Sequence, residues 1–244
     1  MRSGAMTIHK TISGKILYTS KKPDRLDIER GREYFTITKQ SDGYSVLHAH
    51  CEIDDPPDVI RDITSCFETS TMKPRDGSVR LTIGGKFEGS GWFNFSDDAC
   101  ELEVFNVKTG RGSQSQTLPM PATWFGNHAI VNDGFLSRMF PLDAKPGKRR
   151  ISNVMMSSPD HRGATGPELF SLSFGMIYLG DETITVGAGT FEARKFEIVD
   201  TAEGLPEEHP PYVMWCTKDE EGLFLKGGVE GYMMTHYELV ELDR

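Results

Sequence analysis

The sequence predicts an all-β fold: a strongly curved antiparallel sheet or barrel of about a dozen strands, with one or two short helices. Apolar and polar residues alternate over residues 182–198, which is typical of strands with one buried and one solvated face. Phe191 and Ala193 are expected on the buried face, and Glu192 and Arg194 on the solvated face. The 25 glycines gather at turn positions, which suits many short strands. So many strands do not fit one flat sheet, and curvature or closure protects their edges.

The first half of the chain is predicted to contain six strands and one helix. Asp42-Gly43 predicts a hairpin turn, because glycine supplies the positive φ that such turns need. A helix is expected over residues 54–66, opened by Asp55 or Pro56, because Val59, Ile60 and Ile63 fall on one helical face. Strands are predicted over 7–18, 31–40, 44–53, 78–87, 89–95 and 99–109, with turns at 88–91 and 96–98 and a bulge at Gly84-Gly85.

The second half of the chain is predicted to continue the sheet. Two prolines in residues 117–125 indicate a loop or an edge strand. A second short helix is expected over 127–140. Strands are predicted over 150–158, 168–179, 182–187, 190–199, 211–217, 222–226 and 231–242. We expect one β-barrel-like domain over residues 7–244, preceded by residues 1–6 that are disordered or left over from expression.

Composition excludes several classes of protein. The formal net charge of −9 disfavours nucleic-acid binding, because an acidic surface repels phosphate backbones. No apolar run is long enough to span a bilayer, and the first residues contain no secretion signal, so a cytoplasmic protein without membrane contact is expected. The spacing of the four cysteines contains no zinc-binding pattern, and Cys51 and Cys216 are expected to be buried free thiols. The sequence contains no nucleotide-binding loop, and no cofactor is expected.

Three segments resemble the DUF3108 family: residues 136–147, residues 182–197, and a third region at 214–216, 221–226 and 237–242. The most specific part is Val186–Glu192, which matches the family's "V-x-A-G-T-F-E" pattern. The resemblance implies a curved antiparallel sheet or incomplete barrel, similar to lipoprotein-carrier folds that hold apolar molecules on a concave face. It implies no catalytic residues. The chain departs from the family in its N-terminal half and in lacking a secretion signal.

The sharpest local feature is His48-Ala-His50 in the strand predicted over residues 44–53. At a period of two, His48, His50 and Glu52 point to one face of that strand. Inside an apolar barrel, a histidine or carboxylate can acquire a pKa suited to general acid–base catalysis. Glu101 and Glu103 share a face of another strand and could face the same interior. On a solvated face, all of these would be ordinary surface residues.

The same histidines also permit a metal site. His48, His50 and His128 faintly resemble the ligand motifs of cupins, although the glycine and glutamate spacings do not match. Six further residues are candidates for contacting a ligand, with core packing as the alternative. They are Trp92, Phe105, Trp124, His128, Trp215 and Tyr237.

These features favour a cytoplasmic barrel enzyme that encloses a small, partly aromatic or apolar molecule. It would act by metal-free acid–base catalysis of the lyase, isomerase or dehydratase type, with His48 or His50 moving the proton and Glu52 assisting. One alternative is a non-catalytic carrier of small molecules or lipids, and another is a cupin-like metalloenzyme. The expected partner is a small organic molecule, and a homodimer is left open.

Overall fold

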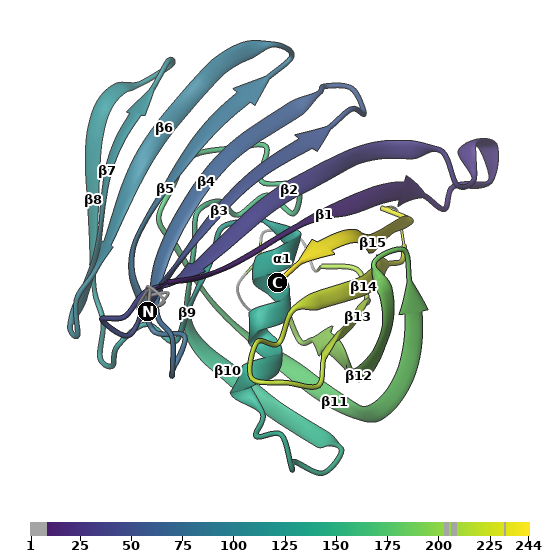
Figure 1. The fold of residues 1–244 in the computed structure, drawn as a ribbon. Coiled ribbons are helices and arrows are strands. Elements are labelled where there is room, and N and C mark those ends of the chain that lie inside the picture. Colours follow the sequence, from purple (N-terminus) through teal and green to yellow (C-terminus); the bar gives the residue numbers. More distant parts are fainter. Residues whose placement is uncertain (1–8, 203–204, 206–208, 232) are drawn as a thin grey trace, which may run out of the picture.

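The computed structural model describes residues 9–202, 205, 209–231 and 233–244, so the expectation for residues 1–6 lies outside the described residues. All of the described strands belong to one sheet, which is antiparallel except at one edge (Figure 1). Its strands are β1 (Lys10–Ser20), β2 (Glu29–Lys39), β3 (Tyr44–Ile53), β4 (Val59–Glu68), β5 (Pro74–Ile83), β6 (Lys86–Phe95), β7 (Ala99–Asn106), β8 (Gly110–Thr117), β9 (Trp124–Gly126), β10 (Gly147–Met156), β11 (Phe170–Val186), β12 (Gly189–Val199), β13 (Tyr212–Thr217), β14 (Phe224–Val229) and β15 (Thr235–Asp243). The helices are η1 (Pro23–Arg25), α1 (Ile130–Gly134) and η2 (Phe135–Met139).

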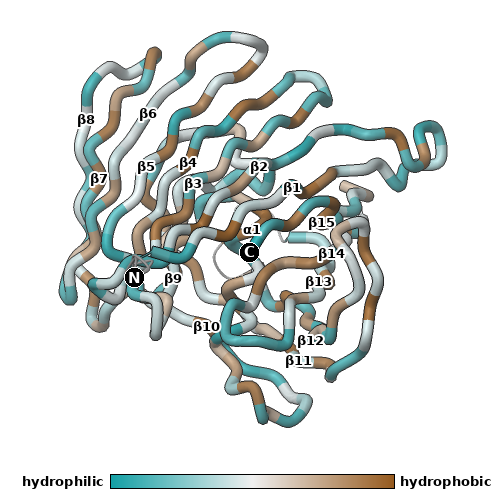
Figure 2. The backbone as a smooth tube through the Cα atoms, in the orientation of Figure 1, coloured by the Kyte–Doolittle hydropathy of each residue, from teal (hydrophilic) through white to brown (hydrophobic). Residues whose placement is uncertain are grey.

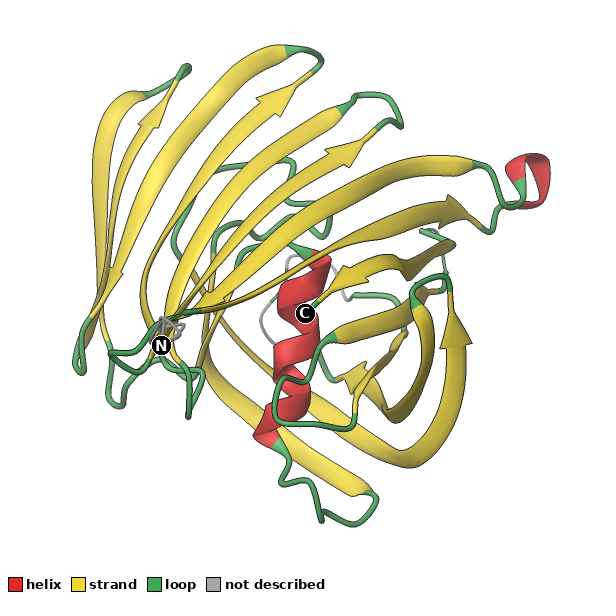
Figure 3. Ribbon diagram, in the orientation of Figure 1, coloured by secondary structure: helices red, strands yellow, loops and turns green. Residues whose placement is uncertain are grey.

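The order of the strands makes an open barrel. Almost every strand pairs with its neighbours in sequence, and β1 also pairs with β15. The edges of the sheet are β8 and β9, and β9 joins the sheet through a parallel pairing with β10. Strands β10–β15 curl around α1, while β1–β8 extend from the curl as a curved wall (Figures 1 and 3). The predicted fold class is therefore confirmed, and the sheet is not closed.

The segment between β8 and β10 folds back inside the curl and forms the centre of the core. Phe125 of β9 packs against Phe93 and Phe95 of β6, at ring distances of 4.8 and 5.0 Å. Phe135 of η2 contacts Phe67 of β4 at 5.2 Å. Apolar and polar residues alternate along the strands (Figure 2), so one face of the sheet packs on this segment and the other stays solvated. No helix among the described residues is long and apolar enough to cross a membrane.

The helix predicted over residues 54–66 is wrong, because this region forms the strand β4. Val59, Ile63 and Phe67 are spaced by four residues, which suits one face of a helix and also one face of a strand. The β-branched Val59, Ile60 and Ile63 favour the extended conformation. Pairing with β3 on one side and β5 on the other satisfies the backbone of β4.

Several predicted boundaries also differ from the structure. The turn expected at residues 88–91 lies inside β6, and the turn instead falls at Gly84 and Gly85, whose φ values of 59° and 69° fit a tight hairpin. The strands predicted over 168–179 and 182–187 are one long strand, β11. Strand β8 was not predicted, since its sequence GRGSQSQT has no apolar residue. The second predicted helix is confirmed as α1 followed by η2.

Two buried charged residues hold the ends of the α1–η2 segment. Glu33 of β2 is fully buried and accepts hydrogen bonds from the backbone amides of Ile130 (2.7 Å) and Val131 (2.9 Å). At the other end, Arg194 of β12 donates to the carbonyls of Phe140 and Pro141, each at 2.9 Å. A carboxylate at the N-terminus and a guanidinium at the C-terminus both complement the helix dipole.

The burial of Arg194 contradicts its predicted place on the solvated face. Ala193 and Arg194 are both buried, so the strict alternation of β12 breaks between them. Cys51 and Cys216 are buried free thiols, as predicted.

Candidate functional site

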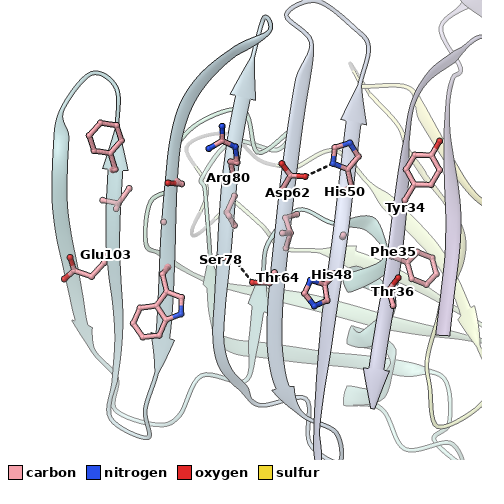
Figure 4. Close-up of a pocket in the computed structure, with 18 of the residues that line it drawn as sticks. Tyr34, Phe35, Thr36, His48, His50, Asp62, Thr64, Ser78, Arg80 and Glu103 are labelled. Atoms are coloured by element: carbon pink, nitrogen blue, oxygen red, sulfur yellow. Dashed lines mark hydrogen bonds and ion pairs between the residues drawn. The ribbon is translucent and has the colours of Figure 1, made fainter. Parts of the chain in front are cut away.

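The histidines predicted to be catalytic lie on the solvated face of the sheet. His48 and His50 project from β3 into a broad groove of about 850 Å³, together with Asp62 of β4 and Glu103 of β7 (Figure 4). His48 is exposed, and the half-buried Glu52 follows on the same face of β3. The predicted sharing of one face is therefore confirmed, but this face is open to solvent rather than enclosed.

His50 takes part in a cross-strand cluster of charges. Its Nδ1 lies 2.6 Å from Asp62 Oδ1, directly across the β3–β4 pairing, and its Nε2 lies 3.2 Å from Glu52 Oε1. Glu52 also pairs with Arg32. Partial burial alone would lower the pKa of His50, but the two carboxylates outweigh it and raise that pKa above its ordinary value. A protonated ring that donates from both nitrogens has no lone pair with which to act as a base.

The six predicted ligand-contacting residues fall into three places. Trp92 and Phe105 line the solvated groove and are 48% and 49% exposed. Trp215 of β13 is bonded to Glu182 through its indole nitrogen (2.6 Å) and is flanked by Lys195 and Lys226. The remaining three line a cavity inside the curl; they are Trp124, His128 and Tyr237.

The predicted metal set is not assembled. His48 and His50 line the outer groove, whereas His128 lines the interior cavity beneath the opposite face. Within the described part of the chain, no group of three or more His, Cys, Asp or Glu side chains is placed to hold a metal ion. His128 therefore joins a different set of residues from the one predicted.

The interior cavity has a volume of about 120 Å³ and lies between α1 and strands β9–β15. Its apolar wall includes Met156, Phe174 and Val229, and the side chains of Asp133, Tyr212 and His209 also reach it. Each comes from a different element: Asp133 from α1, Tyr212 from the start of β13, and His209 from the link between β12 and β13. The fold thus brings ionisable groups from distant parts of the sequence into an apolar space, which is typical of binding and catalytic sites.

Asp133 is the central ionisable group of this cavity. Its Oδ2 accepts a hydrogen bond from Tyr212 Oη at 3.2 Å. Burial raises the pKa of Asp133 to about 7, and the nearby charge of Glu33 adds to the rise, although the bond from Tyr212 opposes it. Burial, followed by the charge of Asp133, raises the pKa of Tyr212 well above its ordinary value. Near neutral pH Asp133 can therefore accept or release a proton, while Tyr212 remains a donor.

His128 is held in one tautomer. Its backbone has a left-handed φ of 65°, and its Nε2 donates to the carbonyl of Ser158 at 3.1 Å. Burial, followed by the charge of Arg61, lowers the pKa of His128 to about 3. The ring is therefore neutral at physiological pH, with its proton on Nε2 and a lone pair on Nδ1.

Two further histidines, His161 and His209, also line the cavity. The rings of His161 and His209 meet edge to face at 4.8 Å. His209 Nδ1 donates to the carbonyl of Pro210 at 2.6 Å, which leaves the lone pair on Nε2. Burial, followed by the charge of His161, lowers the pKa of His209. Its ring lies 6.0 Å from that of Tyr212, so it stands beside the Asp133–Tyr212 pair.

The sequence patterns did not identify Glu33, Arg61 or Asp133 as functional residues. For Glu33 and Arg61, the alternation of the strands contained an indication of burial. Glu33 alternates in register with Phe35 and Ile37, and Arg61 with Val59 and Ile63, so the pattern placed both charges on buried faces. Asp133 lies in the segment predicted as a second short helix, and no local pattern marks its contact with Tyr212.

Comparison with known proteins supports the fold and no more. No family model matches the chain, and no curated protein matches it. A solved structure, a β-barrel-like protein of the domain of unknown function DUF1849 from Brucella abortus, is similar, with a TM-score of 0.55 and 8% sequence identity. The match covers 96% of this chain and 97% of that chain. It agrees with the incomplete barrel that the DUF3108 resemblance implies, but it does not identify that family.

Proposed function

We propose that the protein is an enzyme that encloses a small, partly aromatic or apolar molecule in its interior cavity. It acts on this molecule by metal-free general acid–base catalysis, as lyases, isomerases and dehydratases do. Asp133 moves the proton and Tyr212 assists, in place of His48, His50 and Glu52. The observation that carries the proposal is the contact between the Asp133 carboxyl and the Tyr212 hydroxyl in the wall of an apolar cavity.

The size and lining of the cavity fit a ligand with about one ring. Its volume of about 120 Å³ is close to the roughly 150 Å³ of an engineered apolar cavity that binds benzene. Trp124, Phe174 and Met156 offer ring faces and a thioether to an aromatic body. Polar side chains such as Asp133 and Tyr212 interrupt this apolar lining, as in sites that orient a ligand as well as bind it.

The ionisation of Asp133 suits proton transfer at neutral pH. A general acid or base is most effective when its pKa lies near the working pH, and burial brings that of Asp133 to about 7. The neutral rings of His128 and His209 each keep one nitrogen lone pair, and these acceptors can bind a polar group of the substrate. On the outer groove, by contrast, His50 has both ring nitrogens engaged by carboxylates.

The Kemp elimination of 5-nitrobenzisoxazole tests for a base in an apolar site. The base removes the proton from C3, the C–H electron pair completes the nitrile, and the N–O bond breaks to release a coloured phenolate. We expect turnover about 10²-fold above that of acetate at equal concentration, rising through an apparent pKa near 7. Asp133→Asn should remove the pH transition and lower the rate at least about tenfold.

The variant His48→Ala/His50→Ala is the matched comparison, because it alters the outer groove and leaves the cavity intact. Its rate should stay within about twofold of the wild type. A rate that falls in this variant and persists in Asp133→Asn would return the chemistry to the outer groove. Binding of the probe without turnover in the wild type would instead favour the non-catalytic carrier, which the enclosed cavity also suits.

A further inference from the structure

A second, smaller pocket of about 50 Å³ adjoins the interior cavity. The two share walls formed by His128, Ile130, His161, Met233 and Tyr237. A ligand in the cavity can therefore extend a group of about the size of one or two water molecules into the smaller pocket. We call this space the arginine pocket, because Arg30, Arg61 and Arg162 all line it.

The charge of the arginine pocket is one-sided. Among the described residues, no Asp or Glu side chain lines it. This is unexpected in a chain whose formal net charge is −9. Arg30 is paired with Asp55, which also pairs with Arg25 at 2.8 Å. One carboxylate thus serves two guanidinium groups, and the other two arginines of the pocket add further positive charge.

Arg61 is the buried member of this set. It is 4% exposed, and its guanidinium contacts backbone carbonyls rather than a carboxylate. One Nη donates to the carbonyl of His128 at 2.6 Å and the other to the carbonyl of Arg162, while Nε has no partner within the described part of the chain. A buried charge without a direct ion pair is unfavourable, and contact with an anion relieves that penalty.

The loop that carries Arg162 is shaped to sit on Arg61. Gly163 has a left-handed φ of 60°, and a Cβ atom there would lie 2.4 Å from an Nη of Arg61 and 2.9 Å from the ring of His128. Only a glycine permits this approach. The loop thereby brings Arg162 to the pocket beside Arg61, and two arginines can together bind the two oxygens of one carboxylate.

We propose that the arginine pocket binds the carboxylate of a small aromatic or apolar carboxylic acid, whose apolar body occupies the interior cavity. This inference rests on the proposed function, since it names the class of molecule enclosed there. The carboxylate pairs with Arg61 and Arg162, and the ring extends past His128 and Tyr237 toward Asp133. The arginines thus fix the orientation in which the substrate meets the Asp133–Tyr212 pair.

Three probes of nearly equal size and different charge test the proposal: benzoate, benzyl alcohol and benzylamine. Binding is measured by titration calorimetry and by NMR of ¹³C-methyl methionine, since Met156 and Met233 line the cavity. We expect benzoate to bind at least about tenfold more tightly than benzyl alcohol, as charge-assisted hydrogen bonds predict. Benzylamine should bind most weakly.

Arg61→Met should abolish the preference for benzoate over benzyl alcohol while the alcohol still binds. Because Arg61 is buried and its loss could disturb folding, Arg162→Met provides a second variant on an exposed residue. It should reduce the preference about threefold or more. Arg111→Met is the control: this arginine lies on the outer groove with its side chain 86% exposed, and its loss should leave the preference unchanged.

The outcomes separate the two proposals. If benzyl alcohol binds as tightly as benzoate, or if Arg162→Met and Arg61→Met both keep the full preference, the arginine pocket does not select a carboxylate and the inference is overturned. The enclosed cavity then still stands. If none of the three probes shifts the methyl signals of Met156 and Met233, the cavity itself does not take such molecules, and the proposed function fails with it.

Discussion

The sheet carries two groups of histidine and carboxylate side chains, one on each face. The pKa of the histidine is raised in one group and lowered in the other. On the outer groove, His50 lies between Asp62 and Glu52, and its pKa is raised. In the interior cavity, burial lowers the pKa of His128 to about 3. The same type of side chain is thus shifted toward its cationic form on one face and held as a neutral ring on the other.

The carboxylates show the same contrast. Asp62 and Glu52 are half-exposed and paired with cationic partners, while Asp133 is buried beside a tyrosine hydroxyl and its pKa is raised to about 7. Residue types alone therefore do not identify the group that can act as an acid or a base. Burial and the identity of the partners decide which group can exchange a proton near neutral pH.

The largest effect is expected from the buried carboxylate that holds α1. Glu33→Ala removes the acceptor for two backbone amides, the Tyr18 hydroxyl (2.8 Å) and the Cys51 thiol (3.3 Å). The free energy of unfolding should fall by about 3 kcal/mol or more, measured by denaturant titration. Glu52→Ala on the outer groove is the control and should change it by less than about 1 kcal/mol. If Glu33→Ala and Glu52→Ala lowered the free energy of unfolding equally, the buried carboxylate would not stabilise the fold more than the exposed one.

A similar but smaller loss is expected at the other end of the helix. Arg194→Met removes the hydrogen bonds to the carbonyls of Ser137, Phe140 and Pro141 and should lower the free energy of unfolding by about 2–3 kcal/mol. The neighbouring Lys195→Met loses only a contact with the Trp215 ring and should lower it by less than about 1 kcal/mol. A loss at Arg194 no larger than that at Lys195 would show that the guanidinium does not hold the helix end.

Asp133 should make the protein less stable as the pH rises. Its pKa is about 7 in the folded protein and 3.8 as the reference for the unfolded chain, so the folded state binds the proton more tightly. Stability from this group is therefore fully present below pH 4 and is lost as the pH rises to about 7, by an amount on the order of a few kcal/mol.

Melting temperatures of wild-type protein and Asp133→Asn across this pH range measure the loss. The asparagine variant should be the more stable protein at pH 8 and should lack the decline. A wild-type curve that declines equally in the variant would assign the effect to other groups.

The smallest effect is expected on the outer groove. His50→Ala should lower the free energy of unfolding by less than about 1 kcal/mol, because the ring is part-exposed and its ion pairs are screened. The raised pKa of His50 makes this contribution present at pH 5 and lost as the pH rises through the folded pKa. NMR of the ring protons should place that pKa above 6.5, while His128 should not titrate between pH 5 and 9. If His128 titrated in this range and the pKa of His50 lay below 6.5, the environments described for the two faces would be wrong.

Much of the fold follows from local patterns in the sequence. The alternation in β2, β3 and β12 predicts these strands, because each strand packs one face on the core. The pattern does not predict strand β8, because neither face of this strand carries an apolar residue. Strand β4 was mistaken for a helix, because its apolar spacing fits both periods.

The candidate site could be predicted only in part. Trp124, His128 and Tyr237 were proposed to contact a ligand, and all three line the interior cavity. The choice of His48 and His50 rested on their shared face, and a strand pattern does not reveal which face is covered by a distant segment. The Asp133–Tyr212 contact joins residues 79 positions apart, and nothing local in the sequence predicts it.

The pairing of β1 with β15 has a consequence for the order of folding. Every other pairing in the sheet joins strands that are neighbours in sequence, whereas this one joins Ser13 to Asp243. Contacts between close neighbours form quickly, while closing so long a loop carries a large entropy penalty. Two meanders, β1–β8 and β10–β15, can therefore form early and independently. The α1–η2 segment, held by Glu33 of the first meander and Arg194 of the second, is completed only when they dock. The arginine pocket, whose walls come from both meanders, therefore forms in the last step of folding.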